Sequence, residues 1–276
     1  MKTACIRNFF TALAMGAVCT SAVWAEQGAT APADASAELA KKLQNPVAAL
    51  VSVPLKLDWD TGIGPADADR SVYVVQPVIP FSLNQEWNLI SRTIVSVYID
   101  AQSPVAGGSD TSGSGDVLQS FFFSPKALTA GGWIWGVGPV LSLPTASKDA
   151  LGSEKYGAGP TVVVLRQDSG WTYGMLANHV WSFAGNDSRA DVSATFIQPF
   201  ISYTTKTYTT FGLNIESTYD WEARQWTVPI NASVSQLMKF GKQPVSFAFG
   251  YRNYVDAPTG GPDWGLRFTV TFLFPK

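Results

Sequence analysis

The sequence is poor in the residues that build reactive centres. It has 2 cysteines and 1 histidine among 276 residues, and both cysteines, Cys5 and Cys19, stand near the start of the chain. A metal site needs several His, Cys or carboxylate ligands at workable spacing, so we expect no metal ion and no other cofactor. The same count excludes a disulfide framework and a cysteine nucleophile from everything after Cys19.

Charge is scarce as well. Charged residues make up 14% and aromatic residues 13% of the chain, which is apolar and aromatic-rich for a water-soluble domain. One uncharged run, 127–147, has the length of a membrane helix. Its glycines and its two prolines, Pro139 and Pro144, disfavour a helix, so we expect strands there.

The first residues have the pattern of a secretory signal peptide, which we place at 1–25. Lys2 and Arg7 precede an apolar stretch that ends in the small-residue site Val23-Trp24-Ala25. Without Lys2 and Arg7, 17 of the 19 basic residues remain against 21 acidic ones, a net charge near −4. A chain of this charge has no basic surface for a nucleic acid, so none is expected as a partner.

Residues 26–46 form an N-terminal segment. Its beginning, 26–35, is rich in Ala and Pro and is predicted to be disordered. A short helix is predicted from Ser36, as N-cap, to Leu43, and it ends before Asn45-Pro46. Whether this helix lies in the periplasm or enters the barrel as a plug stays open at this point.

Residues 47–276 read as about twelve β-segments joined by connections that alternate between short turns and mostly longer polar loops. The segments are expected to begin near Val47, Ser71, Glu86, Ser114, Gly132, Tyr156, Gly170, Ala190, Thr207, Gln225, Gln243 and Asp263. Short turns on one side and long loops on the other are typical of outer-membrane barrels. The predicted fold is all-β: a transmembrane antiparallel up-and-down barrel with both termini in the periplasm. We expect the loop 60–70 to be one of the long ones.

Alternation with a period of two predicts which face of each segment meets lipid. In the last segment Trp264, Phe268 and Phe272 share the apolar face, while Arg267 and Thr269 share the polar one. The three preceding segments agree, whereas the faces of the third and seventh stay open. The candidate lumen residues for permeation are Arg92, Asn214, Glu216, Asn231, Arg252 and Arg267.

Tryptophans gather near segment ends, where the two headgroup layers of a bilayer would lie. They are Trp59, Trp87, Trp133, Trp171, Trp221, Trp226 and Trp264. Two Gln-Pro pairs, Gln76-Pro77 and Gln198-Pro199, fall six segments apart and therefore on opposite walls. Proline within paired strands predicts bulges or local unpairing there.

Several strings carry a resemblance to a known family. They are ELAKKLQNPVAALVSVP from Glu38, QPVIPFSLNQEWNLISRT from Gln76, FFFSPK from Phe121, GGWIWGVGP from Gly131 and SYTTKTYTTFGLN from Ser202. The chain resembles bacterial outer-membrane transporters of the meta-pathway phenol degradation-like family, some of which carry the misleading label neuromedin U. The resemblance implies a Gram-negative outer-membrane barrel that passes small solutes, with hydrophobic or aromatic molecules as candidates. It offers no catalytic residues.

The expected function is that of a channel or transporter rather than an enzyme, and its expected partners are the bilayer, the solute and the outer-membrane assembly machinery. That machinery reads a terminal aromatic residue in many barrels, whereas here Phe274 is followed by Pro275 and Lys276. One alternative is a structural or adhesive barrel without transport. Another is a phospholipase-type barrel enzyme, for which Asn178, His179 and Ser182 supply the residue types but not the spacing.

Overall fold

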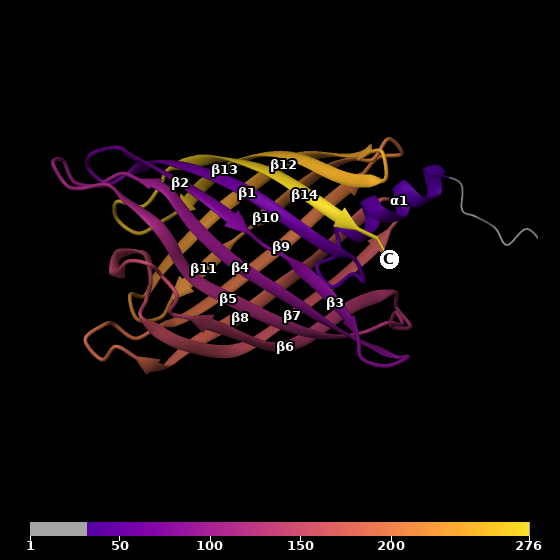
Figure 1. Ribbon diagram of the computed structural model, residues 1–276, viewed down its shortest axis with the longest axis horizontal. Helices are drawn as coiled ribbons and strands as arrows, with labels where there is room; N and C mark the ends of the chain where they lie inside the picture. Colours follow the sequence, from indigo (N-terminus) through magenta and orange to yellow (C-terminus); the bar gives the residue numbers. More distant parts are fainter. Residues whose placement is uncertain (1–31, 276) are drawn as a thin grey trace, which may run out of the picture. The chain divides into compact units, whose positions relative to one another are not determined.

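The computed structural model describes residues 32–275, which form a closed antiparallel β-barrel preceded by one short helix (Figure 1). The predicted signal peptide at 1–25 and residues 26–31 lie outside the described residues. Among the described residues, no helix combines the length and the apolar character needed to cross a bilayer.

The elements follow one another in chain order, and most strands have ten residues or more. They are α1 Pro32–Leu43, β1 Val51–Ile63, β2 Ala68–Val75, β3 Val78–Ser82, β4 Trp87–Ala101, β5 Thr111–Pro125, β6 Trp133–Leu143, η1 Asp149–Leu151, β7 Lys155–Asp168, β8 Trp171–Gly185, β9 Ser193–Thr204, β10 Thr209–Ile215, β11 Ser217–Asp220, β12 Gln225–Phe240, β13 Gln243–Asp256 and β14 Trp264–Phe274.

Each wall segment pairs with its neighbours in sequence, and β14 pairs with β1 to close the ring, from Val51 opposite Phe274 to Thr61 opposite Trp264. Two segments are interrupted: β2 and β3 together form one, and β10 and β11 form another. The described chain therefore makes a barrel of 12 segments, and the predicted fold class is confirmed. Closure leaves no strand edge with unpaired backbone groups.

The two ends of the barrel differ in their connections. The turn end has the connections 83–86, 126–132, 169–170, 205–208 and 241–242, and the loop end has 64–67, 102–110, 144–154, 186–192, 221–224 and 257–263. The prediction of a long loop at 60–70 is wrong, because β1 and β2 continue as a hairpin and leave only 64–67 between them. The positive φ of 67° at Gly64 and of 52° at Asp67 allows this tight connection.

The helix starts earlier than predicted. α1 begins at Pro32, so Ser36 lies inside it and is not its N-cap, and residues 32–35 are helical instead of disordered. Proline suits the first helical position because its missing N–H would have no partner there. The helix lies at the turn end, where Ala40 is buried with Leu237 and Leu273 and the backbone oxygen of Lys41 accepts a hydrogen bond from Gln167.

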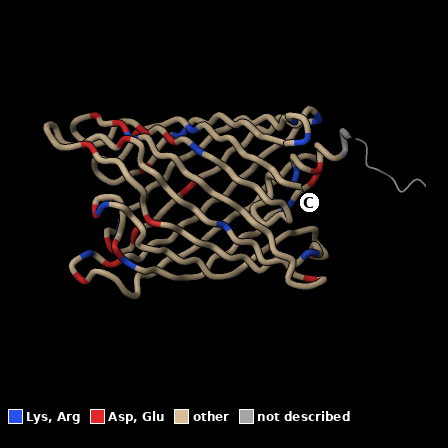
Figure 2. The backbone as a smooth tube through the Cα atoms, in the orientation of Figure 1, with Lys and Arg blue, Asp and Glu red and all other residues tan. Residues whose placement is uncertain are grey.

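The outer surface of the wall is apolar, as the period-two pattern predicts. Phe211, Phe249 and Phe268 are exposed on it, whereas Arg252 and Thr271 are buried inside. The faces left open are now assigned: Arg92 and Ile94 of β4 line interior cavities, and so does Asn178 of β8. Figure 2 shows charged residues mostly near the two barrel ends, with few along the middle of the wall.

Aromatic side chains pair on the wall near both ends. At the turn end the pairs are Trp87–Trp135, Trp133–Tyr173 and Trp171–Tyr203. At the loop end they are Trp59–Trp264, Tyr251–Trp264 and Tyr219–Trp226. All seven tryptophans singled out in the sequence lie close to strand ends, and the strand directions divide them between two belts.

Candidate functional site in the barrel lumen

An interrupted strand brings Glu216 into the lumen. Strand pairing with β9 stops at Asn214 and resumes at Ser217, so Glu216 stands opposite the stretch that holds Pro199. On the other side Pro229 sits at a register shift in β12, and its carbonyl accepts a hydrogen bond from the Glu216 N–H at 3.1 Å. Because neither proline has an N–H to donate, the regular ladder cannot continue here.

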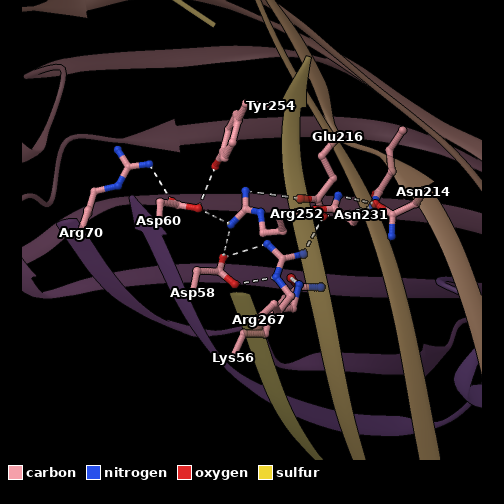
Figure 3. A network of polar contacts seen from close by, with 12 residues as sticks. Lys56, Asp58, Asp60, Arg70, Asn214, Glu216, Asn231, Arg252, Tyr254 and Arg267 are labelled. Carbon is pink, nitrogen blue, oxygen red and sulfur yellow. Dashed lines mark hydrogen bonds and ion pairs between the residues drawn. The ribbon is translucent and has the colours of Figure 1, made fainter. Parts of the chain in front are cut away.

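Arg267 of β14 joins two walls of the barrel. It lies in register opposite Asp58 of β1, and its Nη2 donates to Asp58 Oδ2 at 2.8 Å. Its Nη1 donates to Glu216 Oε1 at 3.0 Å, across the lumen side of β12 and β13 (Figure 3). A planar guanidinium with five donors suits two carboxylates at once.

Arg252 of β13 extends this network toward the loop end. Its Nη1 lies 3.0 Å from Asp58 Oδ2 and 3.5 Å from Asp60 Oδ1. Asp60 also accepts hydrogen bonds from the Tyr254 hydroxyl at 3.0 Å and from Arg70 Nη2 at 2.9 Å (Figure 3). We call this set the charged cluster; it consists of Asp58, Asp60, Arg70, Glu216, Arg252, Tyr254 and Arg267.

Amide side chains complete the polar wall. Gln76 Oε1 accepts a hydrogen bond from Lys56 Nζ at 2.8 Å, and Gln198 Nε2 donates to Glu216 Oε1 at 3.3 Å. The two Gln-Pro pairs thus place both glutamines on the same interior cavity from different walls. Asn231 Nδ2 donates to Asn214 Oδ1 at 2.8 Å, so these two candidates also face inward together.

Three interior cavities follow one another along the lumen. The turn-side cavity, of about 460 Å³, reaches Lys126 and Leu128 and shares Asn45 and Ala48 with the central cavity, of about 390 Å³. The central cavity shares Arg92, Ile94 and Phe196 with the loop-side cavity, of about 300 Å³, which reaches Val192. The lining therefore extends from one end of the barrel toward the other.

The segment after α1, residues 44–50, enters the lumen at the turn end and lines the turn-side cavity there. Val47 is buried with Ile90, Phe122 and Leu176, all of which point inward from the wall. Asn45 holds the segment's bend, since its Oδ1 accepts a hydrogen bond from the Val47 N–H at 2.9 Å. The question of a plug is thus answered in two parts: α1 lies at the rim, and the segment 44–50 enters the lumen.

The six predicted site residues fall into three groups. Glu216, Arg252 and Arg267 belong to the charged cluster, Asn214 pairs with Asn231, and Arg92 stands apart on the cavity lining. Sequence reasoning missed Lys56, Asp58 and Asp60. The signal for them was available, because these residues alternate with Leu55, Leu57 and Trp59 in the first segment. Both arginines of the charged cluster that were predicted as lumen residues, Arg252 and Arg267, are therefore paired with Asp58.

The residue types of a barrel phospholipase do not come together in the described part of the chain. His179 points to the outer face, where its Nδ1 lies 2.7 Å from Thr195 Oγ1 and its ring lies against Trp181. Ser182 Oγ instead donates to Asp191 at 3.2 Å.

The hydrogen bond from Lys155 is the largest cause that lowers the pKa of Asp191 below its ordinary value, and the hydrogen bond from Ser182 is the next.

A scan against protein-family models finds no match, and a search of curated proteins finds no similar sequence. Among solved structures, an outer membrane channel from Pseudomonas putida F1 matches with a TM-score of 0.64 and 14% identity, over 82% of this chain and 96% of that chain. Outer membrane phospholipase A from Escherichia coli gives 0.48 at 10% identity, over 81% and 92% of the two chains. The first likeness shows that the fold is shared.

Proposed function

We propose that this protein is an outer-membrane channel for small solutes. The observation that carries the proposal is the row of three cavities that share lining residues along the barrel axis. A barrel that serves only as a scaffold needs no row of connected cavities, and side chains alone fill the lumen of narrower barrels. The adhesive alternative has no comparable observation in its favour.

The bilayer is the solvent that suits the outer wall. Exposed side chains such as Phe211, Phe249 and Phe268 form an apolar belt between the two aromatic layers, and the charged cluster faces away from it. Closed barrels satisfy every backbone hydrogen bond within lipid. The proposal also includes the route and the orientation of the protein. The signal peptide at 1–25 directs export, and the outer-membrane assembly machinery inserts the barrel. The loop end then lies outside the cell and the turn end in the periplasm.

The solute class follows from cavity size and from the family resemblance. Cavities of about 300 to 460 Å³ admit small molecules, and their linings include apolar residues such as Ile94 and Phe196 beside polar ones. The resemblance to phenol degradation-like transporters points the same way, toward hydrophobic or aromatic compounds. Among the described residues, Asn178, His179 and Ser182 do not form the arrangement that the phospholipase alternative requires.

Fractionation and conductance together test this function. The protein should separate with outer membranes and should migrate differently on gels before and after boiling, because closed barrels resist detergent until heated. In a planar bilayer the purified protein should give discrete current steps. Recovery from the soluble periplasm would contradict the location, and inserted barrels without any current would contradict the channel.

A further inference from the structure

Two cations of the central cavity lack a carboxylate partner. Arg267 is held by Asp58 and Glu216, and Lys42 lies 3.6 Å from Glu38. Lys56 contacts an amide oxygen, that of Gln76. Arg92 has no hydrogen bond or ion pair with any of residues 32–275, and its buried Nε has no partner. Glu216 lines the same cavity and attracts both cations, but its carboxylate is bound by Arg267 at 3.0 Å. Buried cations are normally paired directly, so an additional anion suits Lys56 and Arg92.

Arg92 lies where the central and the loop-side cavities meet, because it lines both of them. The two residues that share this position, Ile94 and Phe196, are apolar. Leu176 and Val78 add further apolar surface to the central cavity. A solute that passes between the cavities therefore meets a guanidinium beside an aromatic ring and aliphatic side chains.

We propose that Arg92 and Lys56 form a binding site for the carboxylate of a small amphipathic solute, whose apolar body packs against Ile94, Leu176 and Phe196. This deepens the proposed channel function and rests on the row of cavities. A guanidinium can bind a carboxylate through two parallel hydrogen bonds, and such charge-assisted bonds are the strong ones. Cavities of about 300 to 460 Å³ have room for an apolar body such as a single ring or a short chain.

Calorimetric titration of the purified protein in non-ionic detergent tests the site, with benzoate as the probe. Benzyl alcohol supplies the ring without the charge, and inorganic phosphate supplies charge without the ring. Benzoate should bind saturably, and both comparison molecules should bind about tenfold more weakly or worse, since each loses one half of the site. Equal binding of either comparison molecule would overturn the assignment of an amphipathic carboxylate.

Arg92→Gln should weaken benzoate binding about tenfold or more, because it removes the positively charged guanidinium group and keeps a polar side chain at this position. Lys56→Gln should weaken it as well and tests the site without touching Arg92. The matched control is Arg166→Gln, the same change on β7 at a position whose neighbour Leu165 is buried inside and which therefore faces outward. Gel migration before and after boiling verifies that each variant is a closed barrel.

Unchanged benzoate affinity in Arg92→Gln, or no saturable binding to the parent protein, would overturn the site. Bilayer currents of the same preparations separate this result from the channel itself. If the barrel conducts but does not bind benzoate, the proposed carboxylate site is wrong and the proposed channel function stands. A barrel that binds benzoate and passes no current keeps the site, and the proposed channel function is then wrong.

Discussion

Replacing Arg267 with methionine is expected to lower the free energy of unfolding by about 3–5 kcal/mol, the cost of removing one partner from a buried ion pair. The loss leaves Asp58, which is 6% exposed, with Arg252 as its remaining ion-pair partner among the described residues, and Glu216 with a contact to Arg252 at 4.0 Å. Methionine keeps much of the side-chain length, so the effect reports charge and hydrogen bonding rather than a large cavity.

Urea unfolding of the barrel in detergent measures this loss. Thr269→Met is the control, since Thr269 lies two residues along the same strand and faces Lys56 in register. Arg267→Met combined with Asp58→Asn should recover part of the stability, because the double change also removes one of the two carboxylates that lose Arg267 as a partner. A loss below about 1 kcal/mol for the single change, which is the size of an exposed pair, would contradict the role given to the charged cluster.

Phe268→Arg is expected to destabilise the inserted barrel by about 2–4 kcal/mol, because it places a cation against lipid near the middle of β14. Phe268 is 51% exposed on the outer wall and packs against Phe249 at a ring distance of 5.0 Å. The yield of heat-modifiable barrel and its unfolding in urea measure the effect.

Asn253→Arg is the control for depth. Asn253 pairs with Trp264 near the loop end of β13, within the aromatic layer, where a cation costs about 0–1 kcal/mol. Equal losses for the two variants would show that the wall at Phe268 does not face a hydrocarbon layer. Both substitutions leave the lumen unchanged, so neither should alter ionic current per inserted barrel.

The fold could be predicted because strand alternation is local. The residues next to Thr271, Arg267 and Phe268 in the sequence show which of them face the lumen and which face lipid. Twelve such segments with apolar outer faces then predict a closed barrel. The charged cluster could be predicted only in part. Asp58 meets Arg267 from 209 residues away, and only closure of β14 onto β1 brings them into register. Reading the first segment with the same alternation would have added both aspartates.

The lumen segment was beyond prediction for a different reason. The prediction that Val47 begins the first β-segment is wrong, because Val47 belongs to no regular element and no period marks it as buried. The other buried residues of its cluster come from four strands, β4, β5, β7 and β8. Arg92 illustrates the limit most clearly. Its residue type and inward face could be anticipated, but the absence of a partner among the described residues depends on the positions of every acid in the barrel.

Ionic current before and after thiol modification of Ile94→Cys tests the solute path most directly. The only native cysteines, Cys5 and Cys19, fall within the predicted signal peptide, and they are replaced by serine in the test protein so that the introduced thiol stands alone. Residue 94 lines both the central and the loop-side cavity. Val95 is the next residue of β4, so strand alternation places it on the outer wall. A cationic methanethiosulfonate reagent should therefore reduce the current of Ile94→Cys and leave that of Val95→Cys unchanged. Current that is unaffected by complete modification at residue 94 would contradict a path through the lumen.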